Sequence, residues 1–388
     1  MAAITIRASM CPSTGDDPSN LARLGVMLTP SRLTLARKRR AMTLVRLAGE
    51  SGISARILSA YEHGTQQPTA SALGTLASAL DVPDAFLTAP DIEEIPVGAI
   101  SYRALSKITA SQRDAARSAA RLAVCLSEWI DERFRLPEPG VPSLPGTDPE
   151  TCAEVVRARW GLGQSPTGNM VHLLEAHGVR VFSLAADCTD VDAFSFWWKG
   201  TPFVFLNTAR TAERGRFDAA HELGHLVLHS GSQSPAGSST EQEASRFAAA
   251  LLMPRDGVLA RGLHRAASDR ILKARHTWKV SAMALAQRLY ELNLLAEWEY
   301  RTACVNLSRM GYRSAEPGGI PRETSQVLAK VFTALRAEGI TAPAVARDLH
   351  LTPDELSRHV FGLVPVAVKG QASVSSPRRP DLQLIKTR

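Results

Sequence analysis

The sequence predicts a mostly helical α+β protein, in which an N-terminal all-α domain precedes a second domain with a small β-sheet. Residues 31–87 have a helical pattern with short breaks at Gly52, Gly64 and Pro83. Short segments between residues 179 and 207 are rich in Val, Phe and Trp, as strands are. Helical patterns return near residue 212 and continue to about residue 363, which makes helix the main element of the fold.

Length and composition favour several soluble domains. The chain has 388 residues, and 45% of them are hydrophobic, which is enough for a sizeable core. The five cysteines are scattered and form no CxxC pair, so a disulfide framework is not expected and a reducing cytoplasm is. No stretch approaches the roughly 18 apolar residues of a membrane span. We therefore expect a cytoplasmic protein with no membrane partner.

Shifts in composition divide the chain into six parts. We expect a flexible arm over residues 1–28, a first folded domain over 29–91, and a helical connector with a loop over 92–148. A second folded domain would occupy 149–310, followed by a C-terminal helical element over 311–365 and a disordered basic tail over 366–388. Clustered prolines and glycines at 137–146 mark the loop in the connector.

Residues 43–68 have the features of a helix-turn-helix. Two short apolar-periodic segments flank Gly52, and glycine tolerates the positive φ of a tight turn. Ser54 follows the turn, where it can cap the second helix. That helix would insert into the major groove of double-stranded DNA. Seven basic residues and one acidic residue lie between Ser31 and Tyr61, and this local positive charge suits a phosphate backbone.

A known DNA-binding family shares this pattern. The recognition helix and exit turn of the Cro/repressor-like (XRE) family resemble Ser54-x-x-Ile57-x-Ser59-x-Tyr61-Glu62-x-Gly64. The chain departs from the family in having Leu44 where Gln often begins the second helix. We expect the side chains that contact DNA to be Arg40, Thr43, Arg46, Ser54, Ala55, Arg56 and Ser59. The alternative is a helical bundle that makes only protein contacts.

A metal site is indicated by the sequence His221-Glu222-Leu223-Gly224-His225 within an apolar-periodic helix. Residues i and i+4 lie on one helical face, about 6 Å apart along the axis. The two imidazoles can therefore converge on one tetrahedral Zn²⁺. Glu222 lies beside the first ligand, where it can act as the general base that activates water. These residue types permit metal-assisted hydrolysis at neutral pH.

A catalytic zinc site needs a third protein ligand. His229 lies about 12 Å from His221 along an unbroken helix, so we expect it to have a supporting or core role. Glu241 and Glu243 open the next helix and are better candidates. Because Glu243 lies one turn before Phe247 on the inward face, we expect Glu243 rather than Glu241 to be the ligand.

The residues that follow the motif resemble a family of metallopeptidases. The ImmA/IrrE family has a similar pattern to His221-Glu222-x-x-His225-x-x-x-His229 followed by Glu243-Ala244-x-x-Phe247-Ala248-x-x-Leu251-Leu252-Met253-Pro254. The resemblance spans about residues 150 to 260 and includes the strand-like segments 192–195 and 203–207. It implies a zincin-like domain, Zn²⁺ as cofactor, and the Glu matching Glu243 as third ligand. It also implies cleavage of a repressor-type protein in a stress or mobile-element response.

Together the two resemblances predict a DNA-binding transcriptional regulator with zinc-dependent endopeptidase activity. The alternative is a non-catalytic repressor or antitoxin-like regulator whose zincin-like domain is a sensing or interaction scaffold. The substrate could be a separate repressor, the chain's own linker or another protein. Near the C terminus, Thr352 and Glu355 form a capping box within a second helix–turn–helix rhythm. We interpret that element as a packing or dimerisation element, which allows a homodimer.

Overall fold

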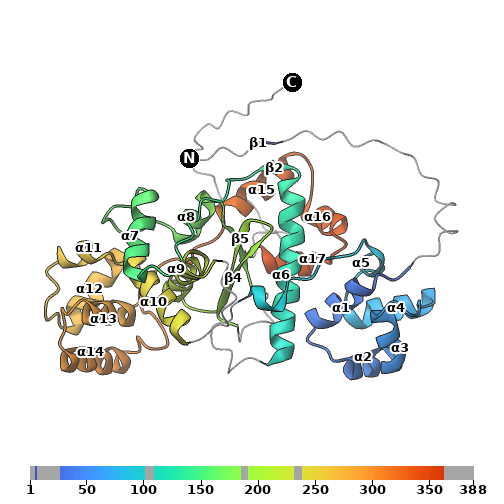
Figure 1. Ribbon diagram of the computed structural model, residues 1–388, viewed down its shortest axis with the longest axis horizontal. Coiled ribbons are helices and arrows are strands. Elements are labelled where there is room, and N and C mark those ends of the chain that lie inside the picture. Colours follow the sequence, from blue (N-terminus) through green and yellow to red (C-terminus); the bar gives the residue numbers. More distant parts are fainter. Residues whose placement is uncertain (1–4, 7–26, 101–108, 185–190, 231–237, 362–388) are drawn as a thin grey trace, which may run out of the picture. The chain divides into compact units, whose positions relative to one another are not determined.

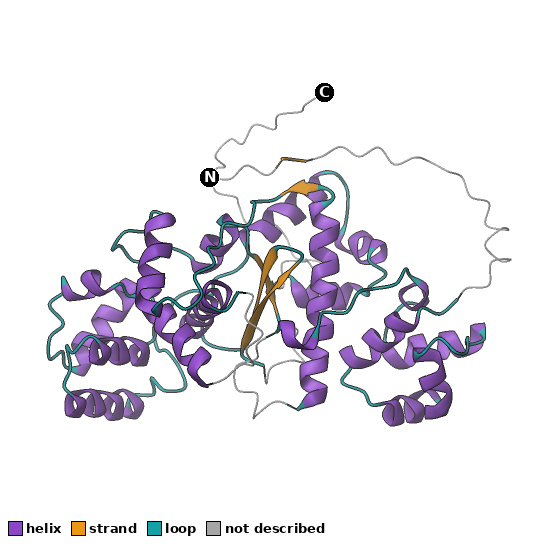
Figure 2. Cartoon of the chain, viewed as in Figure 1, coloured by secondary structure: helices purple, strands orange, loops and turns teal. Residues whose placement is uncertain are grey.

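The computed structural model describes residues 5–6, 27–100, 109–184, 191–230 and 238–361 (Figure 1). It confirms a mostly helical α+β protein with a small sheet (Figure 2). The chain divides into two compact units. Unit 1 comprises residues 1–93, 121–137 and 328–388, and unit 2 comprises 94–120 and 138–327. A search of the described helices for a membrane-spanning segment found none. The predicted tail lies outside the described residues, as does most of the predicted arm.

The N-terminal part of unit 1 is a bundle of short helices. These are α1 (Pro30–Arg39), α2 (Leu44–Ser51), α3 (Ala55–Glu62), α4 (Ala70–Leu80) and α5 (Asp84–Thr88). The hydroxyl of Thr43 accepts from the amide of Arg46 and so caps α2, while the hydroxyl of Ser54 accepts from the amide of Ile57 and caps α3. Gly52 ends α2 with φ of 69°, as a tight turn between these helices requires.

Later parts of the chain complete unit 1. They are the second half of α6 (Ala110–Asp131), and α15 (Gln326–Ala337), α16 (Ala342–Asp348) and α17 (Pro353–His359). Two-residue strands β1 (Thr5–Ile6) and β2 (Phe134–Arg135) pair in antiparallel fashion. Leu122 from α6 and Leu351, just before α17, join the buried leucines and Phe86 of the N-terminal helices in one apolar core. The C-terminal element is therefore part of the same unit as the N-terminal helices.

Unit 2 combines a sheet with two layers of helices. It begins with η1 (Val97–Ala99) and the first half of α6, followed by α7 (Pro149–Arg159), α8 (Met170–Ala176), β3 (Arg180–Ser183), β4 (Ala193–Trp198) and β5 (Thr201–Leu206). It continues with α9 (Ala212–Leu228), α10 (Ser238–Leu252), α11 (Arg255–Leu259), α12 (Ser268–Trp278), α13 (Ala282–Glu291) and α14 (Glu297–Arg309). Helices α7 and α9 both pack against α10.

The three-stranded sheet has the order β3-β5-β4. The edge strand β4 forms an antiparallel hairpin with β5, and Ser195 lies opposite Val204. The other edge strand, β3, runs parallel to β5, and Val181 also lies opposite Val204. Helix α9 packs against β4 and β5 (Figure 1). The sheet therefore brings the polar side chain of Ser195 beside α9.

Helices α9 and α10 approach each other closely at Gly224. A Cβ atom at this position would lie 3.1 Å from both the Cα of Ala244 and the Cδ1 of Phe247. Such distances are tighter than ordinary van der Waals contact, so the glycine permits the close approach. The approach brings the first turns of α10 beside the histidines of α9.

Candidate metal centre and nucleic-acid interface

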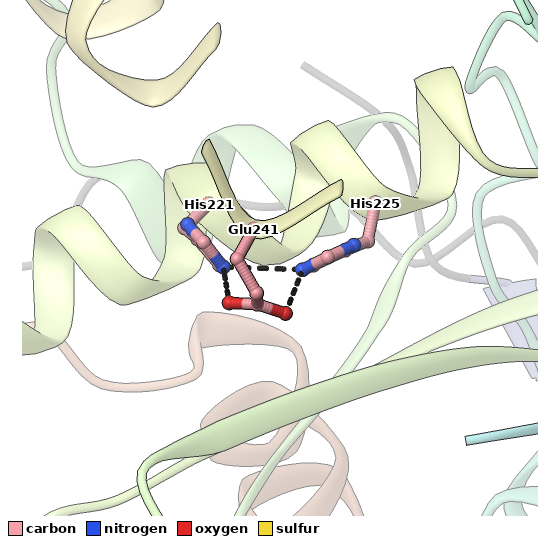
Figure 3. A group of neighbouring side chains, drawn as sticks. All are labelled: His221, His225 and Glu241. Carbon is pink, nitrogen blue, oxygen red and sulfur yellow. Dashed lines mark hydrogen bonds and ion pairs between the residues drawn. The ribbon is translucent and has the colours of Figure 1, made fainter. Parts of the chain in front are cut away.

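Three side chains from α9 and α10 converge on one point (Figure 3). The Nε2 atoms of His221 and His225 lie 3.1 Å apart. One carboxylate oxygen of Glu241 lies 3.2 Å from Nε2 of His221, and the other lies 3.2 Å from Nε2 of His225. Both histidines are buried and Glu241 is half-buried. The three groups therefore present their donor atoms to a common point at the edge of the protein interior.

This arrangement fits a divalent metal ion. Ligand atoms of a tetrahedral zinc site with bonds of roughly 2.0–2.1 Å lie about 3.3 Å from one another, close to the distances above. Two imidazoles and a carboxylate are also a donor set of catalytic zinc sites. Two ring nitrogens that face each other at 3.1 Å cannot both present lone pairs without a proton or a cation between them. The chemistry of the donor set thus agrees with its geometry.

The structure corrects our choice of the third ligand. Glu241 faces the histidine pair, whereas Oε2 of Glu243 lies 2.9 Å from Nε2 of His229. Residues two positions apart project about 200° apart around a helix, so the two glutamates cannot both reach the same pair of histidines. Glu241 lies one turn before Ala244, and Ala244 makes the close contact with α9. Phe247, one turn after Glu243, lies equally close to Gly224 of α9, so the burial of Phe247 could not show which glutamate faces the histidine pair.

The predicted general base, Glu222, is buried next to the histidine pair. Its Oε2 accepts a hydrogen bond of 2.8 Å from the hydroxyl of Ser195 on β4. Burial raises the pKa of Glu222 to about 7, although the charge of His225 and the bond from Ser195 act in the opposite direction. A carboxyl group in this state can take up and return a proton near neutral pH. Ser195 was not predicted to act at the site, since its one signal in the sequence is a hydroxyl within a strand of Phe and Trp.

The outer nitrogen of each histidine also has a hydrogen-bonding partner. Nδ1 of His221 lies 3.2 Å from the hydroxyl of Ser245, and Nδ1 of His225 lies 3.1 Å from Nδ1 of His229. His229 is therefore close to the cluster but does not present a nitrogen to its centre. Ser195 and Ser245 are residues that sequence reasoning missed, and Glu241 was considered but ranked below Glu243. The positions of Glu241 and Ser245 depend on how α10 crosses α9.

Several of the residues predicted to contact DNA lie on the surface of α2, α3 and the turns before them. Arg46 and Arg56 are exposed. Thr43 and Ser54 are also exposed, but their hydroxyls cap the two helices at 3.1 and 3.4 Å. Ala55 and Ser59, on the first two turns of α3, are half-buried. Among the predicted DNA contacts, Arg46 and Arg56 are thus the exposed charged side chains.

Two family models match these two regions. A model described as the IrrE N-terminal-like domain, peptidase family M78, matches residues 174–290, which contain the histidine pair and Glu241. A helix-turn-helix model matches residues 33–87. The chain joins a helix-turn-helix domain to an IrrE-type, metallopeptidase-like domain. This combination confirms the two resemblances seen in the sequence. Searches of curated proteins and of solved structures gave no match.

Several basic residues of the helix-turn-helix domain form ion pairs within the protein. Arg40, a predicted DNA contact, donates to the carbonyl and carboxylate oxygens of Asp81 and to the carboxylate of Glu355. Arg39 is buried with its Nε 2.7 Å from the same glutamate. The structure therefore places Arg40 in ion pairs with Asp81 and Glu355, and its contact with DNA stays a prediction.

Arg37 of α1 is half-buried and also forms an ion pair within the domain. Arg37 donates to both carboxylate oxygens of Glu62, at 2.7 and 2.8 Å, and so ties α1 to the end of α3. Counting basic residues along the sequence thus overestimates the charge that faces outward, because ion pairs are invisible in a sequence. Among the predicted DNA-binding arginines, Arg46 and Arg56 remain exposed.

Proposed function

We propose that this chain is a DNA-binding regulator whose IrrE-type domain is a zinc-dependent endopeptidase. The observation that carries the proposal is the convergence of His221, His225 and Glu241 beside the buried carboxyl of Glu222. The first three side chains would hold Zn²⁺, and a catalytic site of this type leaves one position for water or substrate. When bound, the ion supplies Lewis acidity that polarises a peptide carbonyl and makes water more acidic.

Glu222 would carry the proton in the reaction. A water oxygen forms a bond to the carbonyl carbon of the substrate while Glu222 accepts the proton that the water loses. The carbon–nitrogen bond then breaks, and Glu222 returns the proton to the leaving amine. A pKa of about 7 suits both directions of transfer near neutral pH. Ser195 fixes the carboxyl group in place through its bond to Oε2.

The sheet supports an extended protein segment as the substrate. Strand β4 is an edge strand of the described sheet, and its Ser195 reaches Glu222. A peptide can add to such an edge through main-chain hydrogen bonds, which would align it with the candidate site. The family resemblance makes a repressor-type protein, cleaved in a stress or mobile-element response, the substrate class that we favour.

The helix-turn-helix domain would direct this activity to double-stranded DNA in the cytoplasm. In this proposal α3 enters the major groove, with Arg56 close to the bases or phosphates and Arg46 close to the backbone. Thr43 and Ser54 would contribute through the helix N-termini that they cap, where backbone N–H groups attract phosphate. A homodimer would place two such helices on two half-sites.

A cleavage assay with repressor-type proteins encoded near this chain tests the peptidase. We expect zinc-loaded protein to cut its substrate, and we expect a chelator to stop the reaction. Glu222→Gln should keep its zinc and lose cleavage by at least roughly 100-fold, because the proton acceptor is gone. Glu297→Gln, an exposed substitution on α14, is the matched control and should cut normally.

Two outcomes would count against the proposal. Cleavage by Glu222→Gln at the wild-type rate would remove the general base from the mechanism. Zinc bound by the wild-type chain without cleavage of any candidate substrate would favour the alternative, a non-catalytic regulator that uses this domain as a sensing or interaction scaffold.

A further inference from the structure

A chain of hydrogen bonds leads outward from the candidate metal centre. His225 presents Nε2 to the cluster, and its Nδ1 lies 3.1 Å from Nδ1 of His229. His229 is the residue at which α9 ends, and its Nε2 lies 2.9 Å from Oε2 of Glu243 on α10. These two contacts therefore connect the carboxylate of Glu243, through His229, to the Nδ1 atom of the candidate ligand His225. Neither outer residue has a role in the proposed chemistry.

Only one arrangement of protons satisfies this chain when Nε2 of His225 is a ligand. A coordinating nitrogen needs its lone pair, so the proton of neutral His225 must lie on Nδ1. His225 then donates to Nδ1 of His229, and His229 carries its own proton on Nε2 and donates to Glu243. An ionised carboxylate only accepts hydrogen bonds. Glu243 therefore determines which nitrogen donates and which accepts in both hydrogen bonds.

The corresponding contact of His221 lacks this directionality. Its Nδ1 lies 3.2 Å from the hydroxyl of Ser245, and a hydroxyl can either donate or accept. Ser245 therefore does not by itself select one tautomer of His221. The two candidate ligands thus differ, because His225 is connected to the carboxylate of Glu243 through the imidazole ring of His229.

We propose that His229 and Glu243 are positioning residues that fix the tautomer and ring orientation of His225 for metal binding. This inference rests on the proposed function, because it takes His221, His225 and Glu241 to be a metal site. A carboxylate or carbonyl behind a ligating histidine is a common outer partner, and its loss typically weakens metal affinity about 10- to 100-fold. Here an additional imidazole extends the connection to the surface.

The burial of the three residues makes the role testable without unfolding the domain. The side chains of His225, His229 and Glu243 are 7%, 18% and 46% exposed. The outer members are therefore accessible to water, so changing them leaves no fully buried charge behind. A purely structural role, closing the end of α9 onto α10, would instead be seen in the stability of the metal-free protein.

The test measures the Zn²⁺ affinity of the full-length chain by competition with a chromophoric chelator. Two variants of similar size separate the two roles, because His229→Asn keeps an acceptor near the position of Nδ1 whereas His229→Leu has none. Both lose the contact with Glu243. We expect His229→Leu to weaken Zn²⁺ binding by about 10- to 100-fold and His229→Asn to recover part of that loss.

Two further variants complete the series. Glu243→Gln keeps an acceptor but loses the charge, and we expect a several-fold weaker affinity, since charge-assisted hydrogen bonds are about twice as strong as neutral ones. Gln242→Ala changes an exposed neighbour on α10 and should bind Zn²⁺ like the wild type.

Three results would overturn the inference in distinguishable ways. Equal affinity of His229→Leu and Gln242→Ala would remove any positioning role. Equal losses in His229→Leu and His229→Asn, with a parallel fall in the unfolding temperature of the metal-free proteins, would assign His229 to packing alone. A wild-type chain that binds no Zn²⁺ would instead refute the proposed function on which the inference rests.

Discussion

The difference between Glu241 and Glu243 shows what single residues contribute to the site. Both carboxylates lie beside histidines of α9, but only Glu241 contacts the two that face each other. Burial alone would raise the pKa of Glu241, yet hydrogen bonds from His221 and His225 outweigh it and hold that pKa well below its usual range. Glu241 is therefore an anion at neutral pH, which is the state that a metal ligand needs.

Substituting the two glutamates in turn tests the corrected assignment. Glu241→Gln removes a proposed direct ligand, so we expect Zn²⁺ affinity to fall by more than the roughly 100-fold that loss of an outer partner can cost. Glu243→Gln should cost several-fold only. The measurement is zinc retained per chain after dialysis against a weak chelator. If Glu243→Gln retained less zinc than Glu241→Gln, Glu243 would be the ligand, as the sequence predicted.

Helix geometry explains which site residues could be predicted. His221, Glu222 and His225 follow from spacing within one helix, because i and i+4 always share a face. Glu241 and Ser195 reach the site from α10 and β4, and no spacing rule links those elements to α9. Their positions depend on how α10 crosses α9 and on the register of the sheet. The expected strands and helices are present, but this crossing is a tertiary property.

At the level of elements, the contact between α9 and α10 determines whether the candidate ligands meet. Gly224 lies between His221 and His225 in sequence, and a Cβ atom there would lie 3.1 Å from Ala244 and Phe247 of α10. A side chain there would push α10, and with it Glu241, away from the histidines. The packing of α9 against α10 thus determines the geometry of the candidate metal centre.

Gly224→Ala tests this constraint. Alanine improves helix propensity by up to about 1 kcal/mol, but overpacking a tight contact costs roughly 1–3 kcal/mol. We therefore expect a lower unfolding temperature and weaker Zn²⁺ binding. Gly74→Ala in α4 is the control, because its Cβ meets nothing within 4 Å and should stabilise the protein by about 0.5–1 kcal/mol. Unchanged zinc affinity in Gly224→Ala would show that α10 can move without displacing Glu241.

The segment between α14 and α15 holds the start of α9 through buried charges. The backbone amide of Ile320 donates to Glu213 of α9, and Glu316 accepts from Arg275 of α12 at 2.9 Å. Burial raises the pKa of Glu316 to about 7, and the nearby Glu213 adds to this, although the charge of Arg275 opposes it. The folded protein therefore holds a proton on Glu316 that the unfolded chain releases at lower pH.

This pKa makes the stability of unit 2 depend on pH. Because the folded state binds the extra proton, the free energy of unfolding should fall as the pH rises from about 4.3, the value for an unfolded chain, towards 7. Glu316→Gln carries no such proton, so its stability relative to the wild type should increase from pH 5 to pH 8 by on the order of 2 kcal/mol. Urea unfolding at both pH values checks this, with Glu297→Gln as control. If the free energies of unfolding of wild type and Glu316→Gln change equally between pH 5 and pH 8, the prediction is wrong.

At the scale of the whole molecule, the helix-turn-helix domain is completed by the far end of the chain. From the sequence, residues 311–365 were expected to form a separate C-terminal element, and the helix–turn–helix rhythm with the Thr352–Glu355 box was interpreted as a packing or dimerisation element. Thr352 does cap α17, but Glu355 also forms ion pairs with Arg39, the last residue of α1, and with Arg40, which follows it. Contacts between residues more than 300 positions apart leave no local pattern, so this part of the organisation could not be predicted.

The carboxylate of Glu355 neutralises the charge of the buried Arg39 side chain. Burial alone would raise its pKa, but the hydrogen bond from His359 and the charge of Arg39 hold the pKa well below its usual range. Glu355→Ala leaves Arg39 buried without this partner, so we expect unit 1 to lose roughly 3 kcal/mol of stability at neutral pH. DNA binding should weaken with it, since α1 supports α2 and α3.

The control and the pH dependence make this prediction specific. Asp354→Asn, on the exposed neighbour in α17, should change stability by no more than about 0.5 kcal/mol. Because the pKa of Glu355 is lowered on folding, its contribution is complete above about pH 4.3 and is lost as the pH falls below that value. The difference between wild type and Glu355→Ala should therefore shrink in acid. Equal stability of Glu355→Ala and Asp354→Asn at pH 7 would mean that the C-terminal helices do not support the DNA-binding domain.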